Sequence, residues 1–296
     1  MDMKIYEIRD TTRVYINKLN AKDKLALLKT NPVKYIQRIK HPTKREQKAA
    51  IDIDERCIEY MHLNKKDQLE LIRKYNTYYI RYIKDPCLEV QMAAVTQDGN
   101  AIEYIKDPSP EVQMAAVRQN GDAIIYIKDP STEIQLEAVS EDGTAILCLK
   151  HPSPEVQLAA VKQNGDAIEY IKDPSLEVQL AAVRQNGNAI EYIKDPCLEV
   201  QMAAVENCYN AIIYITRQSE EIILLYISEI RKKGKKEDTL FIFFNSLKTA
   251  SYSTKIKVLE LCIELNMLEL IKRIFNNEIL RYTDLDDATK LLLEML

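Results

Sequence analysis

The pattern of apolar and polar positions repeats every 22 residues over most of the chain. In residues 107–128, DPSPEVQMAAVRQNGDAIIYIK, Asp107 is position 1, and apolar residues at positions 6, 8, 10 and 11 have helical rather than strand spacing. Residues 151–172 match this copy at 18 of 22 positions. Nine units run in one register over residues 19–216, and position 18 is isoleucine in all nine. A repeat of this length indicates stacked small units rather than one globular core.

Each unit predicts two short helices joined by a turn. In the copy 107–128, Ser109 is a favourable N-cap for a first helix that ends at Gln119. Gly121 follows an asparagine, and five of the six glycines occupy this slot, so we expect a left-handed C-cap there. Asp122 then caps a second helix over residues 123–128, which the next Asp-Pro pair ends.

Paired helices of this kind favour an α-solenoid. On a helical wheel, the apolar arc of the first helix is too wide for one neighbour, so each helix has to contact its own partner and the adjacent units. We therefore predict an all-α fold in three parts. They are an N-terminal cap over 1–18, nine 22-residue helical repeats over 19–216, and a helical C-terminal cap or dimerisation domain over 217–296.

The composition changes after residue 216, where all four phenylalanines lie and proline is absent. Repeat arrays need atypical ends that cover the last core face, so a cap is the first interpretation of this region. The apolar tail Leu291–Leu296 offers the alternative of a homodimer seam. Helices are expected at about 219–231, 239–249, 254–265, 267–276 and 286–296.

Two polar columns run through the repeats. Position 7 is glutamine in the six clear copies (Gln113 in the copy above), within the apolar arc of the helix. A buried amide has to be hydrogen-bonded, so we interpret the column as a ladder to backbone groups in the next unit's turn, or else as a polar groove for an extended ligand. Tyrosine recurs at position 20 (Tyr126), which predicts a core residue with a solvated hydroxyl, base stacking being the alternative.

The positions that differ between copies are candidates for partner binding, because a solenoid keeps its framework and varies its recognition surface. Positions 12 and 19 vary most in chemistry. Ile125 and Leu147 interrupt a file of acids at position 19, which suggests an apolar anchor pocket with an acidic rim; drift on a tolerant surface is the alternative. The candidate partner-binding residues are Glu103, Arg118, Ile125, Leu147, Lys162, Glu169, Arg184, Glu191 and Ile213.

Charge is unevenly distributed, although the net charge is only −4. Residues 1–84 carry 20 basic and 11 acidic side chains, whereas residues 85–216 carry 8 basic and 21 acidic ones. The acidic array suits a basic partner, and the basic N-terminal repeats suit an anionic one such as nucleic acid. The lysine column at position 22 is outnumbered by acids, which disfavours nucleic acid along the acidic array.

The sequence holds little that points to catalysis or to a cofactor. It contains no GxGxxG, GxxxxGK[ST], HExxH or GxSxG motif, no zinc-type spacing, and only three histidines. We therefore expect no enzyme activity, no catalytic residue, no metal and no cofactor. The first ten residues lack a secretory signal, the six cysteines form no CxxC pair, and no apolar run is long enough to span a bilayer, so we expect a cytoplasmic protein without a membrane partner.

The unit DPSPEVQMAAVRQNGDAIIYIK resembles the short two-helix repeats of the leucine-rich-repeat-variant and HEAT-like class, whose units also start with Asp-Pro and pack an alanine-rich helix. It is also similar to phage, giant-virus and bacterial proteins built from tandem units with Asn-Gly, Ala-Ile and Tyr-Ile-Lys. The resemblance covers residues 19–216, although copies 19–40 and 63–84 lack the Asp-Pro start. It implies a right-handed α-solenoid that binds macromolecules, and it carries over no catalytic residue.

The sequence thus predicts a non-catalytic scaffold that docks a protein partner on its variable positions. The likeness to phage proteins implies an inhibitor of a host protein inside the infected cell. Two alternatives stay open at this point. One is nucleic-acid binding by the basic N-terminal repeats, and the other is sequestration of a small ligand in the groove by polar side chains such as the position-7 glutamines.

Overall fold

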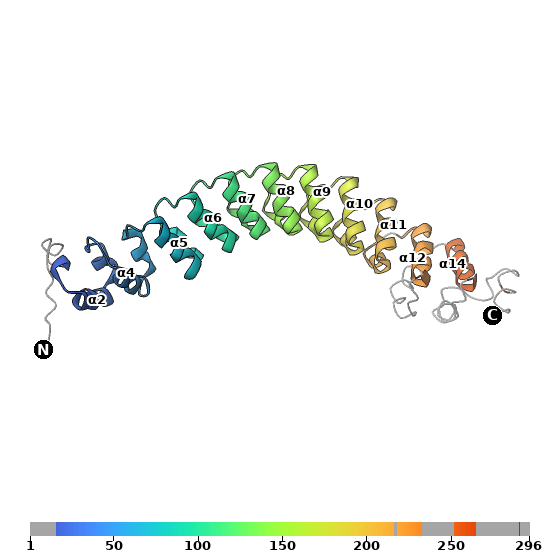
Figure 1. The fold of residues 1–296 in the computed structure, drawn as a ribbon. Helices are drawn as coiled ribbons and strands as arrows, with labels where there is room; N and C mark the ends of the chain where they lie inside the picture. The colour runs from blue at the N-terminus through green and yellow to red at the C-terminus, as the bar shows by residue number, and fades with distance from the viewer. Residues whose placement is uncertain (1–15, 216–217, 233–251, 265–289, 291–296) are drawn as a thin grey trace. The chain divides into compact units, whose positions relative to one another are not determined.

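The computed structural model describes residues 16–215, 218–232, 252–264 and 290. Within these ranges the chain is helical and contains no strand, which confirms the all-α prediction (Figure 1). The chain divides into two units, residues 1–130 and 131–296. In each unit the helix pairs pack in the order of the sequence, as in an α-solenoid.

Every 22-residue copy forms one α-helix followed by a shorter second helix. The first unit holds α2 (Ala21–Thr30) with α3 (Pro32–Ile36), α4 (Lys44–Ile51) with η1 (Glu55–Tyr60), α5 (Lys65–Lys74) with η2 (Thr77–Tyr82), α6 (Leu88–Gln97) with η3 (Gly99–Tyr104), and α7 (Pro110–Gln119) with η4 (Gly121–Tyr126). The second unit holds α8 (Thr132–Glu141) with η5 (Gly143–Cys148), α9 (Pro154–Gln163) with η6 (Gly165–Tyr170), α10 (Leu176–Gln185) with η7 (Gly187–Tyr192), and α11 (Leu198–Asn207) with η8 (Tyr209–Tyr214).

The second helix is a 3-10 helix from η1 onwards, and it begins earlier than the sequence predicted. In the copy 107–128, Asn120 rather than Asp122 is the N-cap, and its side chain accepts a hydrogen bond from the backbone N–H of Asp122. The helix therefore starts at Gly121 and ends at Tyr126. Six residues between an asparagine cap and the next turn leave room for only one short segment, and 3-10 geometry is frequent in short connecting segments.

The glycines at position 15 of the repeats allow close packing between repeats. They do not form the left-handed C-cap that we expected. None of the glycines at 99, 143, 165 and 187 has a positive φ. A Cβ atom on Gly165 would lie 2.6 Å from the carbonyl oxygen of Ala182, and one on Gly187 would lie 2.5 Å from that of Ala204. Glycine is required here because the α-helix of the following repeat approaches the start of the 3-10 helix this closely.

The same junction is held by a side-chain ladder at position 13. Gln185 accepts a hydrogen bond from the backbone N–H of Gly165 (2.7 Å) and donates one to the carbonyl of Gln163 (3.3 Å). Gln163 makes the equivalent bonds to Gly143 (2.8 Å) and to Glu141 (3.3 Å). Each repeat thus satisfies backbone groups of the one before it, so the ladder between repeats exists at position 13.

The position-7 glutamines do satisfy backbone groups, but within their own repeat. The amide of Gln113 donates to the carbonyl of Pro108 at 2.8 Å, five residues earlier. The side chain therefore closes the turn that precedes its own helix instead of bridging to the next unit. The same bond recurs at Gln91, Gln157, Gln179 and Gln201.

The core lies between the α-helices and the 3-10 helices and continues from one repeat to the next. In the copy 151–172, Val156, Ala160 and Val161 of α9 and Ile168 of η6 are buried. In the second unit, α9, α10 and α11 lie side by side and η5 to η8 form a second layer against them (Figure 1). One continuous apolar core therefore extends from Val139 to Cys262 in this unit.

Two further helices follow the array in the described residues. α12 (Glu220–Lys232) packs against α11 and η8, and α14 (Tyr252–Glu264) packs against α12. Both match helices predicted from the sequence, and Tyr226 of α12 is fully buried against the core. The predicted helices at 239–249, 267–276 and 286–296, the proposed seam at 291–296 and most of the predicted N-terminal cap lie outside the described residues.

Two repeats lack the side-chain cap that begins the other clear copies. Ser109, Ser131, Ser153 and Ser175 each accept a hydrogen bond from the third N–H of the following helix, whereas Cys87 and Cys197 make no cap bond. The backbone at Cys197 (φ −66°, ψ 165°) is close to that at Ser175 (φ −62°, ψ 161°). We therefore expect Cys197→Ser to raise the free energy of unfolding by about 0.5–1 kcal/mol, measured by urea unfolding.

The matched control for this cap is Ser175→Ala, which should lower the free energy of unfolding by about 1 kcal/mol because it removes an existing cap. If Cys197→Ser left stability unchanged while Ser175→Ala lowered it, the cap would not transfer between copies.

No helix in the described ranges has both the length and the apolar character that a membrane crossing needs.

Candidate docking surface

The 3-10 helices present their positions 19 and 20 to solvent. A 3-10 helix has three residues per turn, so positions 18 and 21 share one face. In η6 and the residue after it, Ile168 and Ile171 are buried, whereas Glu169 and Tyr170 are exposed. We use the term 3-10 row for the side chains at positions 19 and 20 of successive 3-10 helices within one unit. In the second unit the row contains Leu147, Cys148, Glu169, Tyr170, Glu191, Tyr192, Ile213 and Tyr214.

The tyrosines of the row are surface residues and not the core residues that the sequence suggested. Tyr126, Tyr170 and Tyr192 are 43%, 40% and 43% exposed. In a 3-10 helix, position 20 lies about 120° away from the face shared by the buried positions 18 and 21, which places these rings outside the core.

The carboxylates of the row lie beside its tyrosines. Glu169 raises the pKa of Tyr170 and contributes to the raised pKa of Tyr192, and Glu191 raises that of Tyr214. The physical cause is that a nearby negative charge, with hydrogen bonding by the carboxylate, disfavours the tyrosinate. In the described part of the chain, neither Glu169 nor Glu191 forms an ion pair with a lysine or arginine. The row is therefore aromatic and negatively charged.

Three large apolar side chains also belong to the two 3-10 rows, Ile125 to that of the first unit, and Leu147 and Ile213 to that of the second. Leu147 is 64% exposed, Ile125 is 62% exposed and Ile213 is 43% exposed. An isoleucine or leucine that is mostly exposed loses the free energy that burial would give, so it is available to a partner. Ile125 lies in the first unit and Leu147 in the second, so the expected common pocket of these two residues stays a prediction.

The nine predicted partner-binding residues are exposed, and they belong to two kinds of helix. Six of them, at position 19, belong to the 3-10 helices. Arg118, Lys162 and Arg184, at position 12, belong instead to the last turns of α7, α9 and α10. Basic residues at the C-terminal end of a helix interact favourably with its dipole, which gives these three side chains a structural role.

A cage of tyrosines around Arg81 was not anticipated from the sequence. The guanidinium of Arg81, at position 19 of the copy 63–84, lies 4.6 Å from the ring centre of Tyr78, 5.4 Å from Tyr82 and 5.1 Å from Tyr104. Tyr82 and Tyr104 are the position-20 tyrosines of two successive repeats. Arg81 also donates a hydrogen bond to the hydroxyl of Tyr78. The sequence feature that could have predicted this cage is the arginine at position 19, which no other copy has, together with a tyrosine at position 16.

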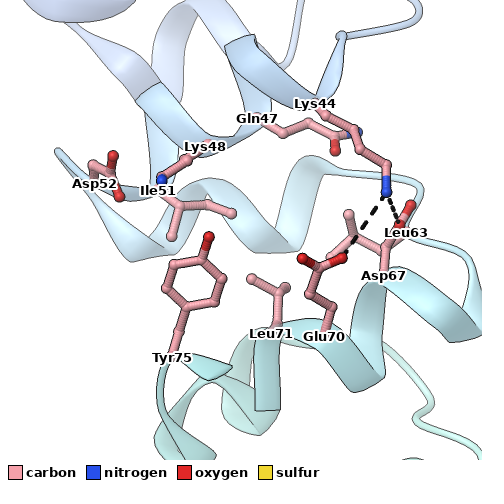
Figure 2. Close-up of a pocket in the computed structure, with 10 residues that line it drawn as sticks. All are labelled: Lys44, Gln47, Lys48, Ile51, Asp52, Leu63, Asp67, Glu70, Leu71 and Tyr75. Carbon is pink, nitrogen blue, oxygen red and sulfur yellow. Dashed lines mark hydrogen bonds and ion pairs between the residues drawn. The ribbon is translucent and has the colours of Figure 1, made fainter. Parts of the chain in front are cut away.

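A separate cavity of about 180 Å³ lies between α4 and α5 in the first unit (Figure 2). Lys44 forms an ion pair with Asp67 (2.9 Å) at one side, and Ile51, Leu71 and Tyr75 line the other. Binding pockets for small molecules usually measure about 300–1,000 Å³, so this cavity is small for a ligand.

The cavity has a simple origin in the sequence. Position 8 is methionine or leucine in the six clear copies, but it is Lys48 in α4 and Glu70 in α5. Charged side chains cannot be buried between two helices without a cost, so this junction does not close like the others. We interpret the cavity as a packing consequence of the charged residues at position 8 of these two repeats.

No group of three or more histidine, cysteine, aspartate or glutamate side chains that could hold a metal occurs among the described residues. Comparison with known proteins adds one partial match. A family described as "Domain of unknown function (DUF4116)" matches residues 153–196, which correspond to the greater part of two repeats. The comparisons with curated proteins and with solved structures gave no match.

Proposed function

We propose that this chain is a non-catalytic scaffold of the leucine-rich-repeat-variant and HEAT-like class that docks a protein partner on its 3-10 rows. The observation that carries the proposal is the exposure of Ile125, Leu147 and Ile213 on short helices whose neighbouring isoleucines are fully buried. Exposed apolar anchors surrounded by tyrosines and charged groups are typical of protein-binding hot spots.

The division between constant and variable positions supports this proposal. Position 18 is isoleucine in all nine copies and is buried, whereas position 19, the next residue, carries glutamine, glutamate, isoleucine, leucine or arginine on the exposed side. The framework is therefore kept while the displayed chemistry changes from repeat to repeat. The resemblance to phage and giant-virus repeat proteins leads us to extend the proposal to a cytoplasmic inhibitor of a host protein.

The two alternative functions have less support. For nucleic-acid binding, several basic groups of the N-terminal repeats are already engaged, since Lys44 and Lys65 form ion pairs with acids and Arg81 lies in its tyrosine cage. For small-ligand sequestration, the position-7 amides donate to proline carbonyls of their own repeats, as Gln113 does. These contacts engage part of the side chains that each alternative would use, so we rank both alternatives below protein docking.

The proposed function is tested by placing charge on the apolar anchors. The doubly substituted chain Ile125→Asp, Leu147→Asp should recover its partner from a source-cell extract at least about tenfold less than wild type, as quantified by mass spectrometry, because a buried aspartate without a partner costs more than 1.4 kcal/mol. Both side chains are mostly exposed, so far-ultraviolet circular dichroism should stay helical.

The matched control is Leu88→Asp, Leu176→Asp. These leucines are 47% and 48% exposed, and they lie in the first turns of α6 and α10, one in each unit and outside the 3-10 helices. The control should recover the same partner as wild type. Equal recovery by the Ile125, Leu147 variant, or an equal loss in the control, would contradict docking on the row.

A further inference from the structure

We propose that the 3-10 row of the second unit binds an extended basic segment of the partner, with two arginines three residues apart that enter between its tyrosines. The first arginine lies between Tyr170 and Tyr192 beside Glu169, and the second between Tyr192 and Tyr214 beside Glu191. The inference deepens the proposed function and rests on it, because it specifies the chemistry of the partner.

The chain's own Arg81 shows how a guanidinium fits between two successive tyrosines of a row. Its centre lies 5.4 Å from the ring of Tyr82 in the same repeat and 5.1 Å from the ring of Tyr104 in the next. Both distances are within the range of a cation–π interaction. The repeat geometry therefore provides a slot between neighbouring position-20 tyrosines that accepts a planar cation.

The second unit contains two such slots with glutamate in place of the arginine. Position 19 is Glu169 in η6 and Glu191 in η7, and the tyrosines that flank these positions are Tyr170, Tyr192 and Tyr214. η6, η7 and η8 pack in succession, as η2 and η3 do around Arg81. Each slot thus keeps its two position-20 rings, has Asp166 or Asn188 in place of the third ring, Tyr78, and presents a carboxylate where the first unit supplies its own cation.

The charge of this region favours a cation from outside the chain. Residues 131–215 contain 13 acidic and 5 basic side chains. Asp166 contributes a second carboxylate near the first slot, since it also acts on Tyr170 and Tyr192. Arginine suits these slots better than lysine, because its guanidinium stacks on aromatic rings and pairs with a carboxylate through two parallel hydrogen bonds.

The spacing of the repeats sets the spacing of the arginines. Packed helices lie about 8–10 Å apart. An extended polyproline-type segment rises about 3.1 Å per residue, so three residues span about 9 Å. Leu147 occupies position 19 one repeat before the first slot, and Ile213 occupies it one repeat after Glu191. The matching segment therefore reads apolar-x-x-Arg-x-x-Arg-x-x-apolar.

The experiment is a titration of a fluorescein-labelled peptide, Ser-Leu-Pro-Ser-Arg-Pro-Ser-Arg-Pro-Ser-Leu-Ser, with the full chain, followed by fluorescence anisotropy. Wild type should bind with a micromolar Kd, and Glu169→Gln, Glu191→Gln should weaken binding at least about tenfold. Tyr192→Ala, which removes the ring shared by both slots, should weaken binding to a similar extent, whereas Tyr192→Phe should keep it.

The matched control Glu155→Gln, Glu177→Gln changes the net charge equally, at exposed positions on α9 and α10. It should alter the Kd less than about twofold, because it affects only the long-range field. A peptide with lysines in place of the arginines should bind more weakly. No binding to wild type, or an equal loss in the control, would overturn the inference.

The two proposals fail in distinguishable ways. If the peptide does not bind but Ile125→Asp, Leu147→Asp still abolishes recovery of the partner, the arginine slots are wrong and docking on the row stands. If the peptide binds to the slots but substitutions in the row leave partner recovery unchanged, the proposed function is wrong.

Discussion

Replacing Gly187 with alanine is expected to lower the free energy of unfolding by about 2 kcal/mol. The added Cβ would lie 2.5 Å from the carbonyl oxygen of Ala204 and 2.7 Å from the Cβ of Cys208, both in the next repeat. Backbone atoms cannot move aside by changing a rotamer, so α11 has to shift away from η7. The loss of unfolded-state entropy that alanine brings offsets only about 0.4–1 kcal/mol of this cost.

Urea unfolding followed by circular dichroism measures this effect, and Asn188→Ala is its control. Asn188 is the next residue of the same 3-10 helix and its side chain is exposed, so the control should change stability by less than about 0.5 kcal/mol. A fully stable Gly187→Ala variant would mean that successive repeats do not pack as closely as the structure shows.

Replacing Ile124 with alanine is expected to lower the free energy of unfolding by about 3 kcal/mol, within the usual range for isoleucine truncation in a core. Its side chain is only 2% exposed and lies in the continuous core between α7 and η4. Truncation removes apolar contacts and leaves a cavity that the close-packed neighbours fill only in part.

The neighbouring residue provides the control, because Ile125 is the same amino acid in the same 3-10 helix but is 62% exposed. Ile125→Ala should change stability by less than about 0.5 kcal/mol. Similar losses for the two variants would show that the 3-10 helix does not divide these positions into an inner and an outer face.

The repeat itself could be predicted from the sequence, and so could the α-helices. Ser109, followed by proline at the first helical position, begins α7, and Gln119 ends it as the sequence predicted. Local signals suffice at these places because a cap and a helical period are properties of adjacent residues. The helices α12 and α14 were likewise predicted close to their observed bounds.

Most of the predictions that were wrong concern contacts between repeats. Gly121 was interpreted as a local turn signal, but the equivalent glycines are needed for the approach of the next α-helix. Gln185 was not recognised as the inter-repeat ladder, because its partners lie 20 and 22 residues away. Tyr170 was interpreted as a core residue, but it lies away from the face of η6 that Ile168 and Ile171 bury.

For the candidate surface, the sequence indicated the exposed column at position 19 but not its aromatic environment. Variation at position 19 drew attention to Glu169 and Glu191, and the structure shows that both are exposed. One repeat alone does not show that position 19 lies near the tyrosines of two successive repeats, as Arg81 does with Tyr82 and Tyr104. Position 12 varies in the same way, yet it lies on the α-helices, so variation alone did not define the surface.

The most direct test of docking on the 3-10 row is hydroxyl-radical footprinting of the full chain, read by mass spectrometry, alone and in complex with its recovered partner. In the free chain, Tyr170 and Tyr192 should be labelled quickly and Tyr226, which is 1% exposed, slowly. In the complex, labelling of the two row tyrosines should fall at least about fivefold, while exposed Leu176 on α10 keeps its rate. Row tyrosines that keep their free rates in the complex, with protection at Leu176 instead, would contradict the account.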